Sequence, residues 1–211
     1  PAPSRKGGTA RLAPLVMTSI LVVCTGNICR SPIAEGMLRN ALAARFGGQA
    51  PTVSSAGTWG VDGAEATPEA VKAAAERGVV IAQHRAHRLS TERAREAHLV
   101  IVMGTEHRDA LAHDLDVASR TFTLKELVRL LESLPPAPSD AGPGRLADRV
   151  AAADEARRGG FQGNPFDEDV ADPIGLPLQS YRAIAWELDE WIARLVDGLF
   201  GADRVAAANE A

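Results

Sequence analysis

A cysteine and an arginine six residues apart have the clearest capacity for chemistry in this chain. Cys24 opens the run Cys-Thr-Gly-Asn-Ile-Cys-Arg-Ser-Pro, and Arg30 stands near its end. A thiolate is a strong nucleophile, and a guanidinium presents a planar fork that can hold two phosphoryl oxygens. The spacing therefore predicts a loop that binds a phosphoryl group and attacks its phosphorus.

The flanking residues predict a strand before this loop and a helix after it. The run from Ile20 to Val23 is apolar and mostly β-branched, which is typical of a buried strand. Pro32 suits the first turn of a helix, and apolar residues then recur at helical spacing as far as Leu42. A strand-to-helix turn points backbone N–H groups and the positive end of the helix dipole at one spot. That field binds an anion and stabilises a thiolate.

The residues inside the loop suit a tight anion-binding turn. Gly26 and Asn27 are the residue types that most readily adopt left-handed backbone, and the Ser31 hydroxyl can donate to the thiolate. A cysteine and an arginine at this spacing are common by chance, whereas the whole run between a strand and a helix is specific. The alternative is a buried core cysteine beside a surface arginine.

Length and composition are those of one α/β domain with a sizeable core. The chain has 211 residues and a formal net charge of −4, which does not indicate nucleic-acid binding. Both cysteines lie in the loop, so we expect no disulfide framework and a reducing, cytoplasmic compartment. The apolar run at 12–23 is too short and interrupted to cross a membrane, and it lacks the small residues of a cleavage site. We therefore expect residues 1–17 to be a disordered or loosely attached extension.

Strand and helix signals alternate along the rest of the chain. Further strands are predicted at 52–55, 98–103 and 120–123, and helices at about 32–46, 67–77, 91–96, from 105, at 124–134, at about 145–158, and at the end of the domain. The pattern predicts a doubly wound α/β fold, with a mostly parallel four-stranded sheet and helices on both faces. In such sheets ligands bind beyond the carboxyl ends of the strands, where the Cys24 loop falls. We expect one domain at 18–200, with a long linker and helix at 135–164, and a tail at 201–211.

A cysteinyl-phosphate mechanism also needs a general acid for the leaving oxygen. The acidic loop before the last helix offers Asp167, Asp169 and Asp172. For Asp167 and Asp169 the alternative is that they are only solvent-exposed charges of an acidic loop.

The run from Val23 to Pro32 closely resembles the signature loop of the low-molecular-weight protein tyrosine phosphatases, and the resemblance covers about residues 18–200. It implies a phosphotyrosine protein phosphatase I-like fold and hydrolysis of protein phosphotyrosine through a phosphocysteine, without metal or cofactor. Cys24 matches the nucleophile, Arg30 the phosphate clamp, and Asp172, followed by Pro173, the general acid. The other loop residues match the phosphate-binding set: Thr25, Gly26, Asn27, Ile28, Cys29 and Ser31.

The resemblance also implies supporting roles. Asn27, Ser31 and Ser55 match a polar network that braces the loop, and His84 matches its supporting histidine. Trp59 is either a core residue or part of the rim of the cleft. The resemblance supports a Cys24–Cys29 disulfide under oxidation, although Cys29 can also be a small apolar plug. The chain departs from the family at Ile174-Gly175, where aromatic residues are usual, and in its longer 135–164 segment.

Four functions fit these residues to different degrees. The first is a protein tyrosine phosphatase, whose partners are phosphotyrosyl proteins such as a kinase, with no nucleic acid and no membrane. The second is a protein arginine phosphatase of the same family. Arginine phosphatases have a similar loop but carry Thr at the position of Ile28, and the apolar surface of Ile28 suits an aromatic leaving group better. A thiol-coupled arsenate reductase of the thioredoxin-linked type needs cysteines outside the loop, which the chain lacks. A non-catalytic phosphate-binding regulatory module would not need Cys24, Arg30 and an Asp-Pro pair together.

Overall fold

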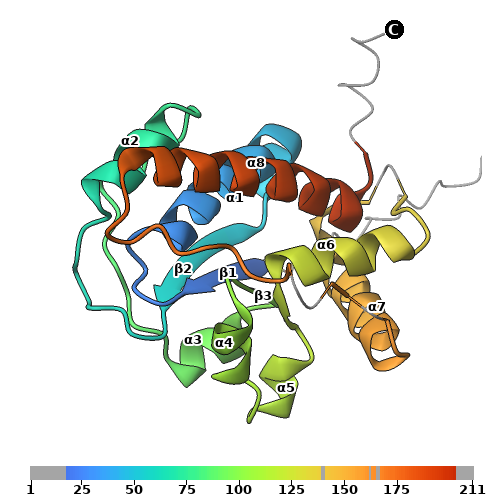
Figure 1. The fold of residues 1–211 in the computed structure, drawn as a ribbon. Helices are drawn as coiled ribbons and strands as arrows, with labels where there is room; N and C mark the ends of the chain where they lie inside the picture. The colour runs from blue at the N-terminus through green and yellow to red at the C-terminus, as the bar shows by residue number, and fades with distance from the viewer. Residues whose placement is uncertain (1–17, 139–140, 162, 165–166, 203–211) are drawn as a thin grey trace, which may run out of the picture.

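The fold is a single sheet between two layers of helices (Figure 1). This computed structural model describes residues 18–138, 141–161, 163–164 and 167–202, so the predicted extension at 1–17 and the tail from 203 lie outside the described residues. Strands run in the order β2-β1-β3-β4, and every pairing is parallel. Their bounds are Ser19–Cys24 for β1, Thr52–Gly57 for β2, Leu99–Val102 for β3 and Thr121–Thr123 for β4. The predicted doubly wound α/β fold is confirmed.

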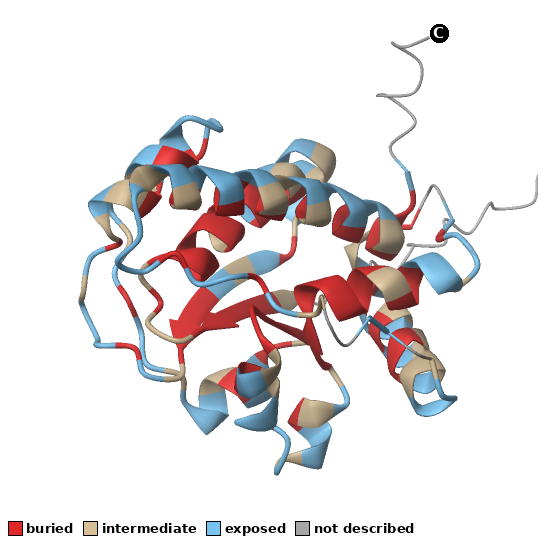
Figure 2. Ribbon diagram, viewed as in Figure 1, coloured by how far each residue is buried: buried red, intermediate tan, exposed pale blue. Residues whose placement is uncertain are grey.

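The position of β1 in the middle of the sheet accounts for its apolar sequence. Ile20 and Val22 belong to the core on one face of the sheet, and Leu21 and Val23 belong to the core on the other. Because β1 has a paired strand on each side and helices over each face, every residue after Ser19 is buried (Figure 2). A continuous apolar run is the sequence that such a position requires.

The larger core lies under the helices drawn above the sheet in Figure 1. These helices are α1 (Arg30–Phe46), α2 (Pro68–Ala75), α6 (Leu124–Ser133) and α8 (Leu178–Phe200), and α7 (Leu146–Arg158), which Figure 1 draws below α6 at the side of the sheet, packs on the same core. The other face carries α3 (Thr91–Glu96), α4 (Thr105–Asp109) and α5 (Leu115–Ala118). Short 3₁₀ turns occupy Gly47–Gln49 and Pro143–Arg145. Among the described residues, no helix is both long enough and apolar enough to cross a bilayer.

Helix bounds differ from the predicted ones by one or two residues. The first helix begins at Arg30, so Pro32 is its third residue. That position still lies in the first turn, whose N–H groups have no partner within the helix. The α2 helix ends at Ala75 and not at Arg77. The capping box at Thr123 is confirmed, because its side chain accepts from the Glu126 N–H and the Glu126 side chain accepts in return.

The last helix closes the larger core. Its apolar stripe, predicted from the spacing between Tyr181 and Leu199, is buried except for Trp191, which is half-buried. The longer segment at 135–164 contains α7, which contributes Leu146, Val150 and Ala153 to the same core. The chain between α7 and α8 then crosses the carboxyl end of the sheet, because the Val170 N–H donates to the Met103 carbonyl just after β3 (2.8 Å). This crossing brings the acidic loop to the end of β1.

Candidate active site

The loop between β1 and α1 turns tightly around one left-handed residue. Asn27 has φ 57° and is the only non-glycine residue with positive φ among the described residues. Gly26 is not left-handed, so the prediction was right for Asn27 and wrong for Gly26. The glycine that the loop needs is Gly57 in β2, where a Cβ would lie 2.6 Å from the Thr25 carbonyl oxygen and 2.9 Å from the Asn27 nitrogen. Any side chain at Gly57 would therefore push the loop away from the sheet.

The Cys24 sulfur is surrounded by hydrogen-bond donors. The Asn27 backbone N–H donates to Sγ at 3.3 Å, and Ser31 Oγ lies 3.0 Å from Sγ. The Asn27 amide donates to Ser31 Oγ at 2.9 Å, so the serine's own hydrogen is left to point at the sulfur. Donors directed at Sγ are the contacts that stabilise negative charge on a sulfur atom.

Asn27 is the centre of a fully satisfied polar network. Its amide nitrogen also donates to Ser55 Oγ at 2.8 Å, and its backbone carbonyl lies 2.8 Å from His84 Nε2. Ser55 in turn donates to Glu35 Oε2 at 2.6 Å. The structure thus brings together the bracing residues expected from the sequence. Glu35 was missed, although it lies one helical turn after Ser31 and could have been noticed there.

The Arg30 guanidinium is buried at the mouth of the loop, with 4% of the residue exposed. Its Nη1 donates to the Val170 carbonyl at 3.1 Å, and its Nη2 donates to Asp172 Oδ2 at 2.5 Å and to Thr25 Oγ1 at 3.2 Å. Its Nε is buried without a partner among the described residues. The phosphate clamp expected from the sequence is therefore fixed from both the loop and the acidic segment.

The three candidate acids have separate surroundings. Asp172 lies on Arg30 and accepts from the Ile174 N–H at 3.1 Å. Asp167 forms ion pairs with Lys125 and Arg129 at 2.7 and 2.6 Å, and the hydrogen bond from Lys125 lowers the pKa of Asp167 from its ordinary value. Asp169 accepts from the Thr105 N–H at 2.7 Å. Of the three, Asp172 alone faces the thiol, and the other two anchor the loop that carries it.

A pocket of about 150 Å³ opens over the thiol. Its lining consists of loop residues and the acidic segment: Cys24, Thr25, Gly26, Ile28, Cys29, Arg30, Asp172 and Ile174. Ile28 and Ile174 are its aliphatic walls. Trp59 is attached to the loop through its N–H, which donates to the Thr25 carbonyl at 2.9 Å. Its side chain is 74% exposed, so the interpretation as a core residue is wrong, and it does not line this pocket.

The second loop cysteine faces the core side of the pocket. Cys29 Sγ lies 3.6 Å from Thr67 Oγ1 and 3.8 Å from Tyr181 Oη. Burial raises the pKa of the Cys29 thiol, so this sulfur is protonated at neutral pH. Tyr181, which the sequence marked only as part of the core stripe of α8, therefore also contacts the underside of the loop.

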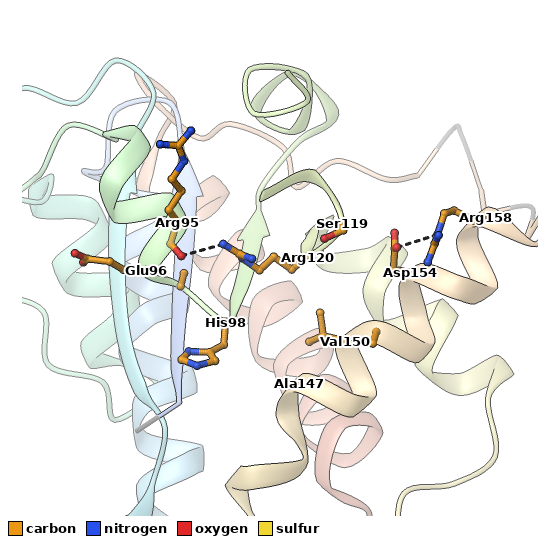
Figure 3. A pocket seen from close by; sticks show the side chains of 11 residues that line it. Arg95, Glu96, His98, Ser119, Arg120, Ala147, Val150, Asp154 and Arg158 are labelled. Carbon is orange, nitrogen blue, oxygen red and sulfur yellow. Dashed lines mark hydrogen bonds and ion pairs between the residues drawn. The ribbon is translucent and has the colours of Figure 1, made fainter. Parts of the chain in front are cut away.

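A larger cavity, of about 500 Å³, lies beside α7 and not at the loop (Figure 3). It is at the amino ends of β3 and β4, next to His98 and Arg120. Several of its charged groups have partners of their own, since Asp154 pairs with Arg158 at 3.0 Å and Arg120 donates to the Arg95 carbonyl at 2.9 Å (Figure 3). No cysteine lines it, so size does not identify the reactive site here.

Sequence and structure comparisons all match members of one family of phosphatases. The family model described as low molecular weight phosphotyrosine protein phosphatase matches residues 19–133, which include the Cys24 loop but not Asp172. A protein-arginine-phosphatase of Geobacillus stearothermophilus is 32% identical over 85% of this chain and 95% of its own length. The low molecular weight protein-tyrosine-phosphatase Etp of Escherichia coli K12 is 43% identical, over 46% of this chain and 61% of its own length. A crystal structure of the low molecular weight protein tyrosine phosphatase of T. tengcongensis has a TM-score of 0.63 and 33% identity, covering 86% of this chain and 99% of that one.

Proposed function

Because the chain belongs to the low molecular weight phosphotyrosine protein phosphatase family, we propose that it hydrolyses phosphotyrosine in proteins through a phosphocysteine intermediate. The observation that carries the proposal is one small pocket that contains the Cys24 thiol, the Arg30 guanidinium and the Asp172 carboxyl. These three groups supply a nucleophile, a clamp and an acid, which together are sufficient for transfer of a phosphoryl group to sulfur.

In the first step the thiolate attacks phosphorus. The phosphoryl oxygens accept from the loop N–H groups and from Arg30, where they compete with Asp172 for Nη2, and the unpartnered Nε supplies a further donor. An S–P bond forms as the P–O bond to the tyrosyl group breaks, and protonated Asp172 gives its proton to the leaving oxygen. Donors fixed before the reaction stabilise the charge on the equatorial oxygens.

In the second step water releases the phosphate. Asp172, now a carboxylate, takes a proton from a water molecule that attacks phosphorus, and the S–P bond breaks. The electron pair returns to Cys24 Sγ, where the Asn27 N–H and the Ser31 hydroxyl stabilise the thiolate. The same donors that prepare the nucleophile therefore make it a good leaving group.

The walls of the pocket favour an aromatic leaving group. Ile28 and Ile174 present aliphatic surface on which a phenyl ring packs, and the only carboxylate lining the described pocket is Asp172. Because Asp172 also serves as the proposed acid, a phosphoguanidinium would find no second carboxylate in the lining of the described pocket. The second candidate substrate is phosphoarginine, because the relative that this chain matches over 95% of its length is a protein-arginine-phosphatase.

Replacing Ile28 by Thr tests this substrate choice. We expect wild-type protein to have the higher kcat/KM on a phosphotyrosyl peptide, and Ile28→Thr to shift the ratio toward the matched phosphoarginyl peptide. The added hydroxyl supplies a hydrogen-bond acceptor for a guanidinium and removes aliphatic surface from beneath a ring. Phosphate release from both peptides measures the ratio. Val80→Thr, a similar change at a side chain that is 80% exposed and outside this pocket, is the control. Equal or better wild-type efficiency on phosphoarginine would contradict the proposal.

Oxidation tests the role proposed for Cys29. Peroxide oxidises the Cys24 thiolate to a sulfenic acid and is itself reduced to water; attack by the Cys29 thiol then forms an S–S bond and releases a second water. We expect wild-type activity to return after dithiothreitol, with a Cys24–Cys29 disulfide in the mass spectrum of the oxidised protein. Cys29→Ser should be active but lose activity permanently, because nothing then intercepts overoxidation. If the activity of Cys29→Ser returned fully after peroxide and then dithiothreitol, Cys29 would be a packing residue only.

A further inference from the structure

A buried histidine outside the proposed mechanism lies against the phosphate loop. His107 in α4 is 1% exposed, and its Nε2 lies 3.0 Å from Thr25 Oγ1. The same hydroxyl oxygen is 3.2 Å from Arg30 Nη2. The Thr25 hydroxyl thus connects His107, which comes from α4, with the Arg30 guanidinium.

The direction of one of these hydrogen bonds is fixed, and the direction of the other depends on which ring nitrogen of His107 carries the hydrogen. A guanidinium only donates, so Thr25 Oγ1 accepts from Arg30. The single hydroxyl hydrogen of Thr25 is then free to donate to His107 Nε2, provided that this nitrogen carries no hydrogen. In that tautomer the ring hydrogen is on Nδ1. Nδ1 faces Gly104, where a Cβ would lie 3.3 Å from it.

The surroundings of His107 keep its ring neutral. Burial and then the nearby Arg30 charge lower the pKa of His107 from its ordinary value. Glu106, whose Oε1 is 3.4 Å from Nε2, a backbone hydrogen bond with Gly104, and Asp169 in the acidic loop act to raise this pKa but do not reverse the shift. A protonated ring would present an N–H to Thr25 Oγ1 and place a second positive charge beside Arg30. A neutral ring with its hydrogen on Nδ1 instead accepts the hydroxyl hydrogen of Thr25 and leaves the oxygen lone pairs to Arg30.

We propose that His107 is a positioning residue for the phosphate clamp, because it orients the Thr25 hydroxyl whose oxygen holds Nη2 of Arg30 at the pocket. The inference rests on the proposed function, since it concerns the group that binds the phosphoryl oxygens. Without the hydrogen bond to Thr25 Oγ1, the only remaining partner of Nη2 is Asp172. An entering oxyanion displaces Asp172 from Nη2, so this carboxylate cannot hold the guanidinium in place during the reaction. His107 therefore matters most for how tightly the pocket holds an oxyanion.

The test compares two amides at position 107. The side chain of His107→Gln reaches as far as Nε2 and supplies an acceptor there, whereas the side chain of His107→Asn ends near Nδ1. We expect inorganic phosphate to inhibit aryl phosphate hydrolysis roughly tenfold more weakly in His107→Asn, the scale of one hydrogen bond to a charged group. His107→Gln should stay within about twofold of wild type. Both variants lose the buried ring, so their thermal unfolding temperatures are also compared. Weaker phosphate inhibition that only reflects a less stable protein would then be accompanied by a lower unfolding temperature.

A double-mutant cycle with Thr25 tests the route of the effect. Thr25→Val removes the hydroxyl, and it should weaken phosphate inhibition about as much as His107→Asn does. Because both act through one oxygen, we expect the double variant to be no weaker than either single variant. Equal inhibition in the Asn and Gln variants, or additive losses in the cycle, would overturn the role of His107.

Direct binding separates this inference from the proposed function. Calorimetric titration with tungstate measures oxyanion affinity without turnover, and it should rank wild type and His107→Gln above His107→Asn. If the full chain released phosphate from neither phosphopeptide but retained that ranking, the proposed substrate class would fail and the role of His107 would stand. If turnover were normal and the ranking absent, His107 would have no positioning role.

Discussion

Cys24→Ser is expected to abolish turnover while leaving oxyanion binding almost unchanged. The serine hydroxyl occupies the position of the thiol, but the donors from Asn27 and Ser31 cannot ionise an alcohol at neutral pH, so no nucleophile forms. The groups that hold the oxyanion, Arg30 and the loop N–H groups, are untouched. Phosphate release from an aryl phosphate at mildly acidic pH measures the loss, and tungstate calorimetry measures binding.

Cys29→Ser is the matched control for this variant, since it makes the same atomic change five residues away in the same pocket. It should retain turnover when peroxide is absent. Residual activity of Cys24→Ser above a few per cent of wild type, and above contamination, would be incompatible with a phosphocysteine intermediate. Loss of tungstate binding together with activity would indicate instead that the thiol holds the loop in shape.

Asp172→Asn is expected to slow aryl phosphate hydrolysis by roughly 10²–10⁴-fold, the usual contribution of a general acid. The amide has the shape of the carboxyl group and can still accept from the Ile174 N–H, but it has no proton to give to the leaving oxygen. The loss should shrink for phosphates whose leaving group is stable as an anion. Because the variant also removes a carboxylate that competes for Arg30 Nη2, phosphate inhibition should not weaken.

Asp167→Asn and Asp169→Asn are the controls for the acid, because each loses a charge in the same loop. Asp167 pairs with Lys125 and Arg129, and Asp169 caps the Thr105 N–H. We expect both variants to lower thermal stability and to leave the dependence on the leaving group unchanged. If either of them shows the leaving-group dependence expected of Asp172→Asn, the acid is misassigned.

Local features of the sequence determined the strands, most helices and the core of the reactive loop. The run Ile20 to Val23 predicted β1 because a strand covered on both faces has to be apolar throughout. Thr123 and Glu126 predicted the start of α6 because both partners of a capping box lie within one turn. The nucleophile and clamp were predicted for the same reason, since Cys24 and Arg30 belong to one short turn whose N–H groups converge. The choice of Asp172 over its neighbours came from the resemblance and not from the local pattern.

Only the tertiary structure decided which distant residues complete the site. Gly57, Tyr181 and His107 come from β2, α8 and α4, and each meets the loop at a distance set by the packing of the sheet and its helices. Nothing in the sequence near these residues distinguishes them from a strand glycine, a core tyrosine or a buried histidine. Their roles depend on hydrogen-bond directions and on close approach, which exist only after the carboxyl ends of the strands have been brought to one edge. A parallel sheet gathers them there because its strands all point the same way.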